Sequence, residues 1–114
     1  MSDITSVDRT NFDEEVVHSD LPIVVMFRAD WSEISEELGP VLQELADEYE
    51  GTVRAATIEI EENGRLCNDM NIAEVPTVFG YHEGNSLKRK AGNVTADELE
   101  EIFDYLASLP EMAA

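Results

Sequence analysis

Cysteine is nearly absent from this sequence, since Cys67 is the only one among 114 residues. One cysteine cannot close an internal disulfide, so the chain gives no sign of an oxidising compartment. Histidine is almost as scarce, with only His18 and His82. Three such scattered side chains do not form the ligand cluster that a structural or catalytic metal site needs. We therefore expect neither a metal ion nor another cofactor.

Basic residues are also few, with 7 Lys and Arg against 26 Asp and Glu and a net charge of -19. Such a surface repels phosphate backbones and anionic lipids, so nucleic acid and membranes are not expected partners. The acidity is explained either by solubility or adaptation to high salt, or by steering toward a basic partner. Three of the basic residues are consecutive, at positions 88–90, which indicates that one edge of the molecule differs in charge from the rest.

Long apolar runs are missing, and none approaches the roughly 20 residues of a membrane span. The first residues lack the basic and apolar regions of a secretory signal, so a cytoplasmic location is the expectation. The composition, 43% hydrophobic and 29% charged, is that of a globular chain. Its length predicts one domain over residues 1–114, with residues 110–114 as a loose tail. The sequence does not indicate an oligomeric state.

Hydrophobic periodicity divides the chain into alternating strands and helices. Apolar or partly alternating runs predict strands over residues 22–27, 53–60 and 75–81. The turn at residues 83–85 predicts that residues 86–91 follow as a polar edge strand. Apolar residues at three- and four-residue spacing predict helices over residues 32–49 and 96–109. A candidate cap and acidic first-turn residues predict a short helix over residues 12–17, and another is expected over residues 65–70, after the turn at residues 63–64. Helix-linked strands imply parallel pairing, while the turn at residues 83–85 implies an antiparallel hairpin. The order predicts a three-layer α/β/α domain with a mixed central sheet of four to five strands and about four helices.

Polar side chains mark where three of these helices should begin. Candidate caps are Asn11 or Thr10 for the first helix, Asp30 or Ser32 for the long helix, and Thr95 for the last. Glu98 lies three positions after Thr95, the spacing of a capping box. Pro40 lies inside the long helix, where we expect a kink.

The segment at positions 31–35 reads Trp-Ser-Glu-Ile-Ser and follows an apolar strand. A Trp-Cys-x-x-Cys segment in that place is a dithiol signature, because two thiols at this spacing close into one disulfide. Here the tryptophan and the spacing are present, but Ser32 and Ser35 stand at the positions of the two cysteines. A serine hydroxyl cannot form that bond.

The chain resembles the thioredoxin family over nearly its full length. The matching segments are residues 11–13, 22–27, 29–31, Pro40, 45–49, 75–77, Gly84 and Gly92. The resemblance implies the thioredoxin fold and a cis peptide between Val75 and Pro76. Cis peptides are largely a proline feature, and this one would turn its backbone toward a bound peptide.

This sequence departs from the family at the positions that carry the family's redox chemistry. Family members have cysteines at the positions of Ser32 and Ser35, usually with glycine and proline between them. By the same resemblance, Met26 replaces a buried aspartate that helps move protons, Thr57 replaces a lysine, and Arg28 replaces a tryptophan. Thiol exchange needs one thiolate to attack and another to leave, and serine oxygens supply neither. We therefore expect no disulfide oxidoreductase activity and no catalytic residues.

An alternative is a thiol-disulfide oxidoreductase whose two cysteines have been replaced by serine. That alternative explains positions 32 and 35 but not Met26 or Thr57. A serine nucleophile is disfavoured, because the predicted topology places neither histidine near Ser32 or Ser35. Cys67 is interpreted as a small buried hydrophobe, with a regulatory thiol near Arg65 as the alternative.

The remaining candidate is the surface that corresponds to the family's peptide groove. Its expected residues are Trp31, Glu33, Ile34, Ile60, Glu74, Val75, Pro76, Thr77 and Gly92. An apolar centre with an acidic rim, to which Glu59 and Glu61 would add, is the usual anatomy of a protein interface. The sequence thus predicts a binding or chaperone-like module for a protein or extended peptide, with a basic one favoured. An inherited surface without a present ligand is the other interpretation.

Overall fold

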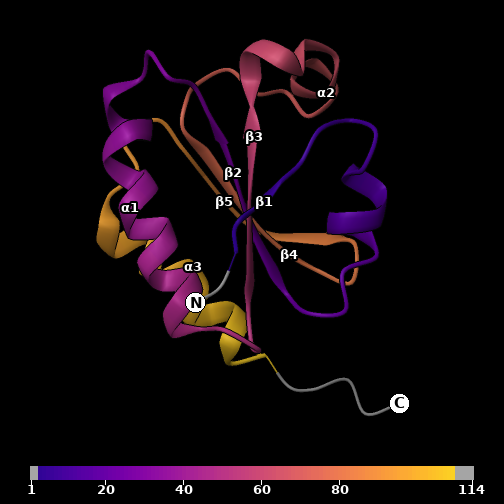
Figure 1. Cartoon of the computed structure of the whole chain (residues 1–114), viewed down its shortest axis with the longest axis vertical. Coiled ribbons are helices and arrows are strands. Elements are labelled where there is room, and N and C mark those ends of the chain that lie inside the picture. The colour runs from indigo at the N-terminus through magenta and orange to yellow at the C-terminus, as the bar shows by residue number, and fades with distance from the viewer. Residues whose placement is uncertain (1–2, 110–114) are drawn as a thin grey trace.

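The computed structural model describes residues 3–109, which form a five-stranded mixed sheet flanked by helices (Figure 1). The strand order is β1-β3-β2-β4-β5. The strands are β1 (Thr5–Ser6), β2 (Ile23–Arg28), β3 (Arg54–Glu59), β4 (Thr77–His82) and β5 (Asn85–Ala91). The helices are η1 (Asp13–Val17), α1 (Glu33–Glu48), η2 (Ile60–Glu62), α2 (Gly64–Asp69) and α3 (Ala96–Ala107). The expected thioredoxin fold, with its mixed sheet, is confirmed.

Strand β2 is the centre of the sheet, and five of its six residues are buried. It runs parallel to β3, with Ile23 opposite Arg54, and antiparallel to β4, with Ile23 opposite Tyr81. Its continuous apolar run fits a strand that is covered on both faces. The hairpin from β4 to β5 turns at Glu83 and Gly84, and both have the positive φ that such a turn requires.

The two faces of the sheet carry separate hydrophobic layers. One layer joins α1 and α3 to Val24, Met26 and Val78. The other joins η1 and α2 to Val25 and Phe27. Figure 1 shows α1 and α3 together on one side of the sheet and η1 on the other. Because successive strand residues point to opposite faces, β2 supplies both layers.

Helix starts were only partly predictable. Thr95 caps α3: its hydroxyl accepts from the Glu98 amide at 3.1 Å, and the Glu98 carboxylate accepts from the Thr95 amide at 3.0 Å. This confirms the capping box. Ser32, and not Asp30, caps α1. The helix continues through Pro40, and the kink there stays a prediction.

The predicted cap of the first helix is wrong. The helix η1 is a single turn of π-helix, and Phe12 precedes it without a side-chain cap. The Asn11 side chain instead accepts from the Asp8 amide at 2.8 Å, while the Asp8 carboxylate accepts from the Thr10 amide at 2.8 Å. Asn11 and Thr10 therefore close the preceding turn, because Asp8 is available to them three and two residues away.

Two short elements, β1 and η2, were not predicted, because two or three residues carry too little periodicity. The predicted tail at residues 110–114 lies outside the residues that the structure describes.

Candidate functional site

The candidate site lies at the end of the sheet where β2 and β3 finish and β4 begins. Chain segments that are far apart in sequence meet there: the turn before α1, the turn after β3, the segment before β4 and the segment after β5. The Val75–Pro76 peptide is cis. Thr77, which follows it, is fully buried, and its hydroxyl donates to the Glu74 carbonyl oxygen at 2.6 Å. The amide of Gly92 donates to the Pro76 carbonyl oxygen at 2.9 Å.

Ser32 and Ser35 have structural hydrogen bonds at the start of α1. The Ser32 hydroxyl accepts from the Ser35 amide at 3.2 Å and satisfies one of the helix's free first-turn amides. The Ser35 hydroxyl accepts from the Ala29 amide at 3.4 Å. Ser32 is 8% exposed and Ser35 is fully buried. The two hydroxyls thus hold the turn that joins β2 to α1.

Trp31 is the most exposed large hydrophobic residue among the described residues, at 66%. Together with Ile60 and Val75 it lines a small pocket of about 190 Å³. The pocket wall is completed by Cys67, Ile72, Ala73 and Glu74. Sequence reasoning missed Ile72 and Ala73, whose only signal was their place just before Val75.

Ile34 faces a different hollow, of about 320 Å³, between the start of α1 and the start of α3. Val41 and Val94 line it as well. Gly92 lies against Glu74 of the first pocket and directly precedes Asn93 of the second hollow. It has a φ of +85°, and a β-carbon there would lie 3.0 Å from the Glu74 carboxylate. Glycine is therefore favoured at this position both by conformation and by the closeness of Glu74.

Arg28 gathers three carboxylates beside the site, a feature that the sequence did not reveal. Its guanidinium contacts Asp30 at 3.1 Å, Glu36 at 2.6 Å, and Glu59. Burial alone would lower the pKa of Arg28, but the hydrogen bond to Asp30 and the charges of the carboxylates raise it overall. The Arg28 side chain is only 17% exposed and links the ends of β2 and β3 to the first turn of α1.

The acidic rim is therefore smaller than the sequence suggested. Glu59 is paired with Arg28 and does not act as a free rim charge. Glu33, Glu61 and Glu74 are exposed, and none has an ion pair within residues 3–109. Glu74 lines the pocket beside Trp31, whereas Glu33 and Glu61 are the exposed chain neighbours of Ile34 and Ile60.

Cys67 lies in α2 and is half-buried in the pocket beside Trp31. Burial raises the pKa of its thiol. A raised pKa favours the neutral thiol, which fits its interpretation as a small hydrophobe better than that of a reactive thiolate.

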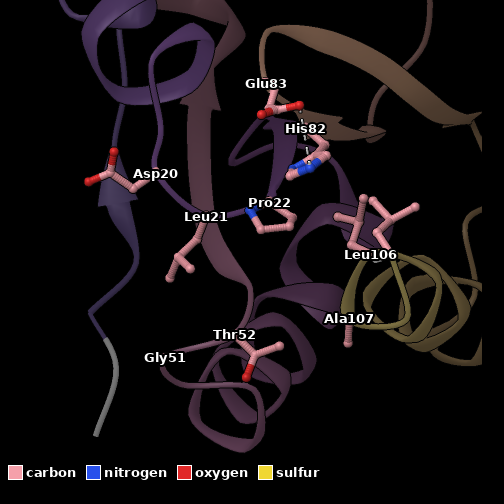
Figure 2. A pocket seen from close by; sticks show the side chains of 10 residues that line it. Asp20, Leu21, Pro22, Gly51, Thr52, His82, Glu83, Leu106 and Ala107 are labelled. Carbon is pink, nitrogen blue, oxygen red and sulfur yellow. Dashed lines mark ion pairs between the residues drawn. The ribbon is translucent and has the colours of Figure 1, made fainter. Parts of the chain in front are cut away.

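The two histidines lie away from Ser32 and Ser35. His18 follows η1, and His82 ends β4, whose antiparallel pairing places it near the beginning of β2. Around His82 is a hollow of about 500 Å³, which Pro22, Thr52 and Leu106 help to line (Figure 2). Both nitrogens of His82 are buried without a hydrogen-bond partner among the described residues, and Nε2 lies 3.8 Å from the Glu83 carboxylate. Because this hollow is at the opposite end of β2 from Ser32 and Ser35, it is not the candidate site.

Within residues 3–109, no group of three or more His, Cys, Asp or Glu side chains has metal-binding geometry. No described helix has the length and hydropathy to cross a membrane.

Comparison with known proteins gives one consistent result. A family model described as "Thioredoxin" matches residues 3–105. The chain is similar to "Probable thioredoxin-2" of Caenorhabditis elegans, with 36% identity over 93% of this chain and 72% of that protein. It is also similar to "Thioredoxin" of Buchnera aphidicola, with 32% identity over 91% of this chain and 96% of the relative. "Thioredoxin 1" of a Nostoc strain is 28% identical over 91% and 97% of the respective chains.

Proposed function

The chain belongs to the thioredoxin family, and from this premise we propose that it binds proteins or extended peptides without exchanging disulfides. The binding surface would be the area beside the Val75–Pro76 peptide, in a chaperone-like or adaptor role. A cytoplasmic location is part of the same proposal. The observation that carries it is the combination of an exposed Trp31 with two hydroxyls where a dithiol would have to act.

The absence of redox chemistry follows from the atoms at positions 32 and 35. Disulfide exchange requires a thiolate to attack, a second thiol to resolve the mixed disulfide, and a route for protons. Ser32 and Ser35 provide neither sulfur, and their hydroxyls are occupied by the Ser35 and Ala29 amides. Cys67 has no second cysteine in the chain with which to form an internal disulfide.

Binding is supported by the exposure and composition of the surface. A tryptophan that is 66% exposed costs solvation free energy unless a partner covers it. Large aromatic residues beside small pockets are typical hot spots of protein interfaces. The pocket next to Trp31 has room for one medium-sized apolar side chain.

The free carboxylates favour a basic partner. Glu74 lines the pocket beside Trp31, Glu33 and Glu61 are exposed next to Ile34 and Ile60 in the chain, and the whole chain has a charge of -19. Charge complementarity of this kind mainly increases the association rate and selectivity, and salt weakens it. An extended segment with one apolar side chain flanked by Lys or Arg fits both features.

The binding proposal is tested by capture of partners from an extract at low and high salt. Trp31→Ala should lose most of the captured basic proteins, whereas Tyr105→Ala should retain them. Tyr105 is a suitable control because it is another exposed aromatic residue, at 38%, and lies on α3 away from the site. Equal capture by both variants would contradict the proposed surface. No capture at low salt by the unmodified chain would contradict binding of a basic partner.

The alternative function, a thiol-disulfide oxidoreductase whose cysteines have been replaced, is favoured by the names of the relatives. An insulin-reduction assay of the sequence as encoded in its native gene separates the two. Turnover like that of an ordinary thioredoxin would overturn the first proposal.

A further inference from the structure

Strand β5 forms a long open edge of the sheet. Of the two edge strands in the described chain, β1 has two residues and β5 has seven, all of them exposed. An edge strand presents unpaired amides and carbonyls that can pair with another extended chain. Pairing with β4 is regular from Lys88 to Ala91, and a bulge at Leu87 interrupts the ladder before it.

This edge carries unusual charge for such an acidic chain. Three of the seven basic residues, Lys88, Arg89 and Lys90, are on β5. Lys90 has an acidic partner, since its Nζ lies 3.0 Å from the Glu98 carboxylate. Lys88 and Arg89 have no acidic partner within residues 3–109. Two uncompensated cations at one edge are notable where acidic residues are so numerous.

Both cations are held in defined positions by other contacts. The Lys88 ammonium lies 4.5 Å from the centroid of the Tyr105 ring. The Arg89 guanidinium lies 4.9 Å from the centroid of the Phe79 ring and donates to the Asn71 carbonyl oxygen at 2.8 Å. These contacts restrict the side chains without neutralising their charge. Less conformational entropy is then lost when an anion binds.

The two cations lie on opposite faces of the sheet. Lys88 contacts Tyr105 on α3, whereas Arg89 contacts the segment that follows α2. Successive residues of a strand added to β5 would likewise point to alternate faces. Two consecutive acidic residues in that strand would therefore reach one cation each.

We propose that the β5 edge accepts an extended acidic segment of a partner protein by strand addition along Lys88–Ala91. Main-chain hydrogen bonds supply the pairing, and adjacent Asp or Glu side chains contact Lys88 and Arg89. This surface is separate from the groove and differs from it in charge preference. The two are nonetheless adjacent, because Gly92 directly follows β5 and bonds to Pro76.

Other occupants are disfavoured by charge. A second copy paired through the same edge would bring the cations of the two β5 strands together, and like charges on adjacent strands are destabilising. The net charge of -19 repels nucleic acid, which carries a charge at every phosphate, more strongly than a segment with only two acidic residues. Lysines on edge strands also protect against aggregation. That protective role alone predicts no binding of an acidic strand, so experiment can separate the two.

The test uses the full-length chain and a synthetic peptide of about eight residues, in which Thr and Val alternate around a central Glu-Asp pair. At low salt, two-dimensional NMR should show saturable shifts of the β5 amides and slower hydrogen exchange along residues 88–91. Lys88→Glu should weaken binding by about threefold to tenfold, the range for one or two exposed charge contacts. The same peptide with a central Lys-Lys pair should not shift these amides.

Arg9→Glu is the matched control, because it makes the same charge change at an exposed residue near the opposite edge, just after β1. It should leave the affinity for the acidic peptide within twofold of the unmodified chain, an estimate of about 0.4 kcal/mol or less. Lys88→Glu must retain the melting curve of the parent chain, and Lys88→Gln serves in its place if it does not. Trp31→Ala should bind the acidic peptide normally. A failure of the proposed groove is therefore distinguishable from a failure of the β5 proposal.

Three results would overturn the proposal. One is the absence of saturable shifts in β5 at low salt. Another is equal weakening by Lys88→Glu and Arg9→Glu, which would indicate a general effect of net charge. The third is binding of a single-stranded oligonucleotide or of a second copy at this edge without binding of the acidic peptide.

Discussion

Met26 and Thr57 are directly opposite each other in the register of β2 and β3, in the middle of the sheet. Met26 is fully buried and packs in the layer formed by α1 and α3. By family resemblance these two positions usually carry an aspartate and a lysine. A paired set of polar groups is thus replaced by a thioether and a hydroxyl on adjacent strands. Proton transfer at this point would require titratable side chains at both positions.

Restoring the two sulfurs should not restore the full activity. We expect Ser32→Cys combined with Ser35→Cys to reduce insulin, but at least about tenfold more slowly than an ordinary thioredoxin. Positioned acid–base groups contribute a factor of about 100 or more to such steps, and Met26 cannot supply one. The measurement is the initial rate of insulin reduction with dithiothreitol as reductant. A rate equal to that of an ordinary thioredoxin would show that Met26 is no obstacle.

Met26→Asp should destabilise the fold in a pH-dependent way. A carboxyl placed in this apolar layer has a folded-state pKa above its unfolded value of about 3.9, because burial disfavours the charged form. The cost is therefore smallest below about pH 4 and grows by about 1.4 kcal/mol per pH unit until the folded-state pKa is reached. Urea unfolding at several pH values measures it, and Met26→Asn is the uncharged control. A pH-independent loss would exclude this explanation.

Arg28→Met should loosen the start of α1. It removes the cation that three carboxylates share, and Glu36 and Glu59 are then left near each other without compensation. We expect a loss of about 1–3 kcal/mol, larger at low salt than at high salt. Arg54→Met is a useful comparison, because within residues 3–109 Arg54 pairs with only one carboxylate, that of Glu15. A smaller effect for Arg28 than for Arg54 would contradict the importance of the shared cluster.

Tyr49 should ionise only near pH 12. Its hydroxyl donates to the Asp104 carboxylate at 2.7 Å, and this hydrogen bond, with smaller effects of desolvation and nearby charges, raises its pKa to about 12. The folded-state pKa lies above the unfolded value of about 10. The stabilisation is therefore complete below about pH 10 and is lost as pH rises through 12. Absorbance titration measures the pKa of Tyr49, with the parent chain compared with Tyr49→Phe and Asp104→Asn. An unchanged titration curve for Asp104→Asn would show that the hydrogen bond to Asp104 is not the cause of the raised pKa.

Cys67 should react slowly with alkylating reagents in the native chain. Burial raises the pKa of its thiol, so little thiolate is present at neutral pH. Labelling with iodoacetamide, followed by mass spectrometry, should accelerate strongly once urea unfolds the chain. Fast labelling under native conditions would support the regulatory-thiol alternative instead.

The periodic parts of the chain were predictable, and the contacts between distant charges were not. The buried stripe of α3 and its Thr95–Glu98 cap follow from spacing alone. By contrast, the cluster around Arg28 joins Glu36 and Glu59 through the tertiary fold, and nothing local marks them as partners. The same reason explains the error at Asn11, where the competing residue Asp8 decided which turn was capped. The groove residues were inferred from family resemblance, and no local pattern identifies them.

The hydrogen bonds of Ser32 and Ser35 have a consequence for any partner bound nearby. In a dithiol protein this turn exists in an oxidised and a reduced form, so partner binding at the surface around it can depend on the redox state. Here the turn is held by two hydrogen bonds between serine hydroxyls and backbone amides, and neither bond is formed or broken by oxidation or reduction. The affinity of a complex at this surface would therefore not be switched by a disulfide in this turn. The occupancy of this surface would be governed by partner concentration and ionic strength.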